Sequence, residues 1–147
     1  MLLITYGTRP EYIKVLPVIN EMKKRNMPFK SFFTGQHTDL LKKASKPDHV
    51  LEILDNGNRL DSIIQSILNK EEIFVDITCV MVQGDTTSAF ATALAAFHRK
   101  IPVAHLEAGL RTFDKYSPYP EEFNRCAISA LAEIHLCPTD ISASNLK

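Results

Sequence analysis

Excess positive charge is absent from this sequence of 147 residues, because 17 lysines and arginines are balanced by 17 aspartates and glutamates. A nucleic-acid-binding surface usually carries a basic excess, so this balance argues against one. The charge balance does not exclude a local phosphate-binding site, since a few arginines suffice to form one. A hydrophobic content of 45% is enough for a buried core, and the length fits one domain.

Cysteine is scarce, and Cys79, Cys126 and Cys137 are widely spaced. Their odd number and spacing fit neither a disulfide framework nor the C-x2-C pattern of zinc sites. The histidines also lack the i, i+4 spacing of metal ligands. The sequence therefore predicts three reduced, mostly buried thiols in a cytoplasmic protein, and no metal site.

Long apolar runs are missing as well. No stretch reaches the roughly 20 residues that cross a bilayer. The N-terminus has no basic segment and its apolar run ends at Gly7, so it predicts a strand and not a signal peptide. We therefore expect a soluble, intracellular chain that does not contact a membrane. Neither G-x-G-x-x-G nor a Walker A loop is present, which argues against the dinucleotide fingerprint and the P-loop.

Short apolar runs alternate with longer helical patterns, which indicates βαβ units and a parallel sheet. The expected strands span residues 2–6, 29–33, 77–82, 102–106 and 134–137, with a short strand at 50–54. The expected helices span residues 10–25, 60–68, 86–98 and 121–133, with further helices starting near Thr38 and Thr139.

The first helix should begin at a capping box formed by Thr8 and Glu11, and Pro17 should kink or shorten it. Apolar spacing predicts the buried sides of two helices. These are Ile13, Leu16, Ile19 and Met22 in the first helix, and Phe123, Ala127 and Ala130, with Ile134 just beyond, in the helix at 121–133.

Four polar clusters follow directly after predicted strands, at residues 7–11, 34–37, 83–88 and 105–111. The carboxyl ends of parallel strands meet at one edge of a sheet, where open α/β folds bind ligands. Arg9 lies at a helix N-terminus, which is a natural phosphate site, although an ordinary turn with a solvated arginine fits equally. Lys14 lies one turn further on and could point to the same edge or into solvent. His37 and His105 are expected to be hydrogen-bonding or structural histidines.

Three carboxylates are expected at this edge. The spacing of Asp85 favours a helix N-cap over a catalytic carboxylate. Glu107 is either a structural ion pair with Arg111 or a general acid or base. Glu121 is either an i, i+4 partner of Arg125 or is aimed into the cleft. Converging carboxylates often carry proton transfers, because crowding pushes their pKa values apart.

The ordered motifs at residues 7–14, 34–37, 84–87, 105–112 and 116–125 resemble those of non-hydrolysing UDP-N-acetylglucosamine 2-epimerases. The resemblance implies the N-terminal half of a GT-B-type enzyme: residues 1–147 form a Rossmann-like α/β domain, a parallel sheet with helices on both faces. Such chains are more than twice as long, so the C-terminal UDP-binding domain is expected to be missing here.

The resemblance also implies roles for individual residues. Asp85, Glu107, Glu121 and Lys14 match catalytic residues, and Arg9 and Arg125 match substrate-binding residues of the cleft. Gln36 and His37 match part of an allosteric UDP-GlcNAc site found in many bacterial members.

The implied reaction interconverts UDP-GlcNAc and UDP-ManNAc by eliminating UDP and adding it back, with no cofactor, for cell-surface polysaccharide synthesis. A homodimer is expected for the full-length protein, and the isolated half is expected to be inactive. The alternatives are half of a hydrolysing epimerase or of a GT-B glycosyltransferase, and a non-catalytic domain that binds a nucleotide or a partner.

Overall fold

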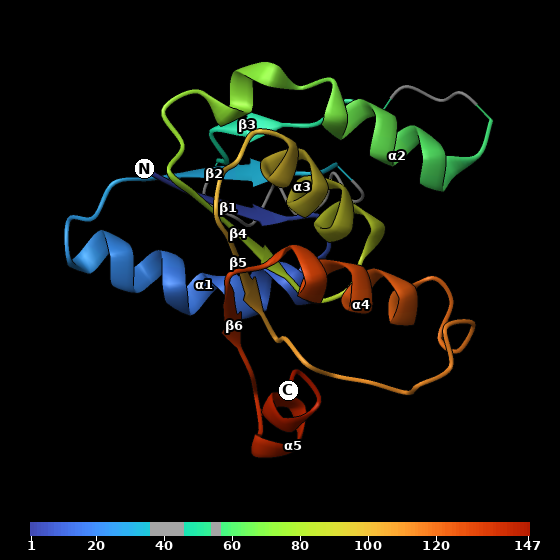
Figure 1. Ribbon diagram of the computed structural model, residues 1–147. Coiled ribbons are helices and arrows are strands. Elements are labelled where there is room, and N and C mark those ends of the chain that lie inside the picture. Colours follow the sequence, from blue (N-terminus) through green and yellow to red (C-terminus); the bar gives the residue numbers. More distant parts are fainter. Residues whose placement is uncertain (36–45, 54–56) are drawn as a thin grey trace.

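A computed structural model describes residues 1–35, 46–53 and 57–147 (Figure 1). The helix expected near Thr38 lies outside these residues, as do Gln36 and His37. Within the described part, parallel strands form one sheet in the order β3-β2-β1-β4-β5-β6. The strands are β1 (Leu2–Tyr6), β2 (Phe29–Phe33), β3 (His49–Val50), β4 (Cys79–Gln83), β5 (Val103–Leu106) and β6 (Ile134–Leu136). This order reverses direction between β1 and β4, which makes a topological switch point there.

Helices cover both faces of the sheet, as predicted. They are α1 (Arg9–Lys24), α2 (Arg59–Leu68), α3 (Thr87–His98), α4 (Glu121–Leu131) and α5 (Asp140–Ser144), with a 3-10 turn at Glu71–Phe74. Alternate residues of β1 point to opposite faces. Leu3 packs in the cluster formed with α2, α3 and α4, whereas Ile4 and Tyr6 pack against α1. In Figure 1, α5 lies beyond β6, away from the body of the sheet.

The predicted elements shift by only a few residues, with two differences. The strand expected at 50–54 is His49–Val50, and α1 continues past Pro17 to Lys24 instead of ending early. The capping box of α1 is confirmed, because Glu11 N–H donates to Thr8 Oγ1 at 3.4 Å and Thr8 N–H donates to Glu11 Oε2 at 2.6 Å.

The predicted buried side of α4 is wrong. Phe123 is 52% exposed, Ile134 is 49% exposed, and the helix buries Glu122, Asn124 and Ile128 instead. Two of these are polar and have hydrogen-bond partners inside the fold, which removes most of the cost of burying them. Ala130 is also exposed, while Ala127 is partly buried.

The first helix departs from its predicted buried side at Ile13, which is 56% exposed. Val15 lies in the core in its place, and Leu16 is only partly buried. The three cysteines form no disulfide, but the expectation that they are mostly buried is wrong, because Cys79 and Cys137 are only partly buried and Cys126 is exposed. Within the described ranges, no group of side chains could hold a metal ion, and no helix is long and apolar enough to cross a membrane.

Candidate functional site

Lys14, Gln83 and Glu107 meet at the carboxyl edge of the sheet. Lys14 Nζ donates to Glu107 Oε1 at 2.7 Å and to Oε2 at 2.5 Å, and Gln83 Nε2 donates to Glu107 Oε2. The three residues come from α1, the end of β4 and the residue after β5. The predicted pair of Glu107 with Arg111 is wrong, since Arg111 donates to Leu110 O and Ser129 Oγ.

The backbone of Glu107 has φ +69°, a left-handed conformation that is uncommon for a residue other than glycine. It is held there because the N–H groups of Glu107 and Ala108 both donate to Leu136 O, at 3.0 and 3.1 Å. Such a conformation costs on the order of 1 kcal/mol and is concentrated at functional sites. This backbone therefore favours a functional carboxylate over an incidental one.

Asp85 lies beside this group and is not the cap of α3. Thr86 is the N-cap, accepting from Ala89 N–H at 3.2 Å, so the cap interpretation of Asp85 is wrong. Arg125 Nη2 instead donates to Asp85 Oδ2 at 2.5 Å. Burial raises the pKa of Asp85; Arg125 opposes this rise, and the nearby charges of Glu121 and Glu107 add to it.

Glu107 and Glu121 are thus both close enough to Asp85 to act on it electrostatically. Glu121 forms no hydrogen bond or ion pair within the described part of the chain, and its expected i, i+4 pair with Arg125 is not present. Arg125 pairs with Asp85 and, through Nη1, with Glu122 Oε2 at 3.4 Å. Arg9 is exposed in the first turn of α1.

A further buried glutamate, Glu11, supports the site and was not predicted as part of it. Glu11 Oε2 accepts from the N–H groups of Gly7 and Thr8, each at 2.6 Å, and Oε1 accepts from Thr86 Oγ1 at 2.7 Å. It therefore joins the turn after β1 to the turn after β4. The capping box indicated the contact with Thr8 N–H, but no local pattern indicates the contacts with Gly7 N–H and Thr86.

His105 and Asn124 hold the turn that carries Asp85. His105 is fully buried, and its Nε2 lies 2.7 Å from Gly84 O, which can only accept, so Nε2 carries the hydrogen. Burial lowers the pKa of His105. Asn124 Nδ2 donates to Asp85 O at 2.9 Å. The expectation that His105 is a structural, hydrogen-bonding histidine is confirmed.

A groove of about 370 Å³ opens beside the Lys14–Glu107 pair. Leu106, Leu136 and Pro138 supply its apolar wall, while Lys14, Gln83 and Glu107 supply its polar side. A site of this kind, with an ammonium group, several carboxylates and an open apolar wall, can hold a polar ligand and move protons on it.

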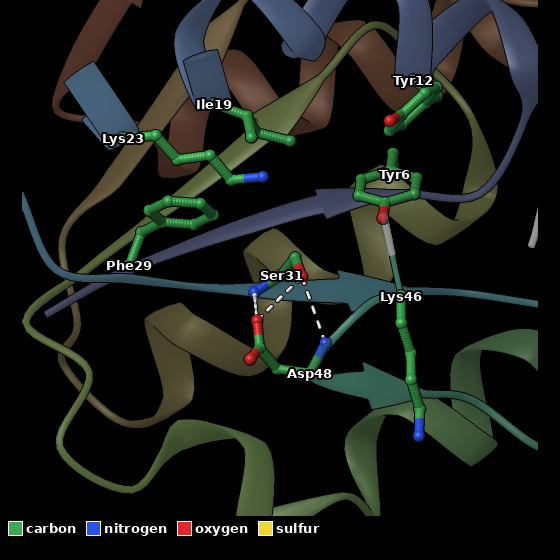
Figure 2. Close-up of a pocket in the computed structure, with 8 residues that line it drawn as sticks. All are labelled: Tyr6, Tyr12, Ile19, Lys23, Phe29, Ser31, Lys46 and Asp48. Carbon is green, nitrogen blue, oxygen red and sulfur yellow. Dashed lines mark hydrogen bonds between the residues drawn. The ribbon is translucent and has the colours of Figure 1, made fainter. Parts of the chain in front are cut away.

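A second pocket, of about 190 Å³, lies between α1 and β2 (Figure 2). Tyr6 and Tyr12 face each other there with ring centroids 5.1 Å apart, and burial raises the pKa of Tyr6 to about 12. Asp48 Oδ2 accepts from Ser31 N–H at 2.7 Å and from Ser31 Oγ at 2.8 Å. None of the predicted catalytic and substrate-binding residues lines this pocket, so we do not include it in the candidate site.

The strand order defines a class, a Rossmann-like α/β domain of the kind found in GT-B enzymes, and the candidate site lies at its topological switch point. A family model described as UDP-N-acetylglucosamine 2-epimerase matches residues 20–147. The chain belongs to this family.

Relatives and solved structures agree with this assignment. A UDP-N-acetylglucosamine 2-epimerase of Neisseria meningitidis is 44% identical over 153 residues, covering 98% of this chain and 41% of the relative. A crystal structure of UDP-GlcNAc 2-epimerase from Neisseria meningitidis bound to UDP-GlcNAc is 42% identical, with a TM-score of 0.91 over 99% of this chain and 42% of that one. The Methanocaldococcus jannaschii enzyme in complex with UDP-GlcNAc and UDP is 34% identical, with a TM-score of 0.88 over 99% and 42% of the two chains. The chain therefore spans about two-fifths of the length of these relatives.

Proposed function

We propose that residues 1–147 form the N-terminal domain of a non-hydrolysing UDP-GlcNAc 2-epimerase, an isomerase that interconverts UDP-GlcNAc and UDP-ManNAc. The observation that carries this proposal is the meeting of the Lys14–Glu107 pair with Asp85 and Arg125 at the switch point. It supplies carboxylates for proton transfer and cations for a phosphate-bearing substrate in one place. Relatives with the same fold bind UDP-GlcNAc and UDP.

The proposed reaction needs one proton removed from sugar C2 while the C1–oxygen bond to UDP breaks, giving a 2-acetamidoglucal and UDP. Re-addition of UDP to C1, with a proton delivered to the other face of C2, gives the epimer. Atoms and electrons balance without an oxidant or a cofactor. The chemistry requires at least two proton-carrying groups and cations near the leaving diphosphate.

Asp85, Glu107 and Glu121 are proposed to share these proton transfers. Burial raises the pKa of Asp85, which suits this carboxyl to carrying a proton. Lys14 is proposed to hold Glu107 in place and to offset the charge of UDP together with Arg9. Arg125 is proposed to bind substrate charge beside Asp85.

A chimera tests the proposal directly, because the isolated chain is expected not to turn over. The segment of the Neisseria meningitidis enzyme that this chain matches is replaced by residues 1–147, and the products from UDP-GlcNAc are analysed by NMR. We expect UDP-ManNAc from the chimera and none from the 147-residue chain alone. Free ManNAc with UDP would instead identify a hydrolysing enzyme. A folded chimera that binds UDP-GlcNAc but forms neither product would favour a non-catalytic domain.

Two partners are part of the proposal. Ile134, Leu136 and Ile141 are 49%, 41% and 77% exposed at the β6–α5 end, and we propose that a C-terminal UDP-binding domain covers them. The full-length protein is proposed to form a homodimer, and the exposed apolar residues predict that the isolated chain self-associates. Sedimentation that shows a monomer at all concentrations would contradict that prediction. A cytoplasmic location and a role in cell-surface polysaccharide synthesis follow from the proposed substrates.

The allosteric role of Gln36 and His37 stays a prediction. In the chimera, it is tested by replacing both residues with alanine and measuring whether the rate responds differently to the UDP-GlcNAc concentration.

A further inference from the structure

Glu122 is a charged side chain with almost no access to solvent. It is 2% exposed in the first turn of α4, directly after Glu121. Its Oε2 accepts from Thr112 N–H and its Oε1 from Phe113 N–H, each at 3.0 Å. The carboxylate therefore ties the middle of the loop between β5 and α4 back to the start of the helix.

The same carboxylate shares a cation with the candidate site. Arg125 is 12% exposed at its side chain, and its guanidinium reaches Asp85 Oδ2 through Nη2 at 2.5 Å and Glu122 Oε2 through Nη1 at 3.4 Å. An arginine does not lose its proton in a protein, so one fixed positive charge serves two carboxylates. One of them belongs to the proposed proton-transfer site, and the other lies behind it.

The two carboxylates have opposite surroundings. Burial acts to raise the pKa of Glu122, but the N–H groups of Thr112 and Phe113, together with Arg125, hold it below its usual value. The backbone N–H groups and Arg125 therefore stabilise the ionised form of Glu122, whereas burial disfavours the ionised form of Asp85. The charged groups that act on Asp85 are Arg125 and Glu121 from α4, and Glu107 from the end of β5, while Glu122 reaches Asp85 only through Arg125.

We propose that Glu122 is a positioning residue that sets how strongly Asp85 holds a proton, by fixing the Arg125 guanidinium and offsetting part of its charge. This proposal rests on the proposed function at one point, which is the proton transfer assigned to Asp85. Without the negative charge of Glu122, the guanidinium would act on Asp85 alone and favour its ionised form. Glu122 itself touches no reacting atom in this account.

A purely structural role for Glu122 makes the opposite prediction for Asp85. If Glu122 only anchors the loop, replacing it loosens α4 and Arg125, and Asp85 then becomes harder to ionise or does not change. The direction of the change in the Asp85 pKa therefore separates the two roles, even if the substitution also lowers the free energy of unfolding.

The experiment is a carboxyl carbon NMR titration of the 147-residue chain and its Glu122→Gln variant, with the Asp85 signal assigned by its loss in Asp85→Asn. We expect the proton affinity of Asp85 to fall about tenfold in Glu122→Gln, the scale of one removed charge in a partly buried cluster. In an Arg125→Gln background, Glu122→Gln should produce less than half of that change. An unchanged or raised Asp85 pKa in Glu122→Gln would overturn the proposal.

A second variant decides the matter if Glu122→Gln does not fold. Coupling between two sites is reciprocal, so neutralising Asp85 must shift Glu122 by the same factor. The Glu122 pKa should therefore fall in Asp85→Asn, and an unchanged value would refute the coupling. Neither measurement requires turnover, so a failed epimerase assay and a failed coupling are separate outcomes.

Discussion

Glu11 and Glu122 are both buried glutamates, yet an isosteric change to glutamine should have very different effects on the two. Glu11 is 5% exposed and Glu122 is 2% exposed, and each carboxylate accepts backbone N–H groups. The difference lies in which oxygen accepts them. The perturbation is therefore the same single-atom exchange at two positions, and the structure predicts the order of the effects.

At Glu11, both backbone donors reach one oxygen, Oε2, and the other oxygen meets the hydroxyl of Thr86. A glutamine can place its carbonyl oxygen at the first position and its amide group toward the hydroxyl, which can also accept. Both backbone N–H groups keep their acceptor, and the Thr86 hydroxyl exchanges a donated hydrogen bond for an accepted one. The remaining cost is the loss of charge from these bonds, about 1 kcal/mol of the free energy of unfolding.

At Glu122, the two backbone donors reach different oxygens, Thr112 N–H at Oε2 and Phe113 N–H at Oε1. In either orientation, the amide group of a glutamine faces a backbone N–H, so a buried donor loses its acceptor. That costs about 1–3 kcal/mol, to which the loss of charge beside Arg125 adds, for a total of about 3 kcal/mol.

Urea unfolding of both variants, followed by circular dichroism at pH 7, measures the difference. We expect Glu122→Gln to lower the free energy of unfolding by about 2 kcal/mol more than Glu11→Gln does, with equal urea dependence in the two variants. Equal losses, or a larger loss in Glu11→Gln, would show that the arrangement of donors at the two carboxylates is not as described.

Three further predictions concern the turns around the site. Gly109→Ala should lower the free energy of unfolding by at least 3 kcal/mol, or displace α5, because the added Cβ would lie 2.0 Å from Ser142 O at a residue with φ +84°. A melting temperature within about 2 °C of the wild-type value would contradict this. Burial lowers the pKa of His105, so the contribution of His105 to stability is complete above about pH 6.5 and is lost as the pH falls below that value. His105→Gln should therefore flatten this part of a curve of unfolding free energy against pH. An unchanged curve would contradict this role of His105. Burial raises the pKa of Asp85, so the ionised form destabilises the folded state above the folded-state pKa. Asp85→Asn should therefore not lower the free energy of unfolding at pH 7, but it should abolish turnover in the chimera. A destabilised variant with full activity would refute both expectations.

The strands and the edge at which the polar clusters meet could be predicted from the sequence. Short apolar runs marked β1, β2, β4 and β5 to within a few residues, because strands buried on both faces carry a continuous apolar signal. The position of polar residues directly after those strands then predicted where they gather. Asp85 and Glu107 are found at that edge for this reason.

The partners of those residues could not be predicted, since they come from distant parts of the chain. Lys14 and Glu107 are 93 residues apart, and the i, i+4 pattern on α4 suggested Glu121 as the partner of Arg125. The structure pairs Arg125 with Asp85 across 40 residues instead. Local spacing reports neighbours on one helix, and it carries no information on which turn a long side chain reaches.

The buried side of α4 was mispredicted for a related reason. Apolar periodicity assigned Phe123 to the interior, whereas the loop backbone and the turn after β4 need acceptors and donors there. Glu122 and Asn124 meet those needs, and Phe123 is left exposed, in contact with Phe90 at a centroid distance of 5.9 Å. A hydrophobic pattern contains no information on the backbone groups that a loop places next to a helix.

The central claim is that carboxylates at this edge exchange the proton on C2 of a UDP-linked amino sugar. The most direct measurement runs the chimera with UDP-GlcNAc in deuterium oxide and follows C2 by NMR. Proton removal to a carboxylate that exchanges with solvent predicts deuterium at C2 of UDP-ManNAc, and Asp85→Asn should suppress it. UDP-ManNAc formed with its C2 proton retained would contradict the account.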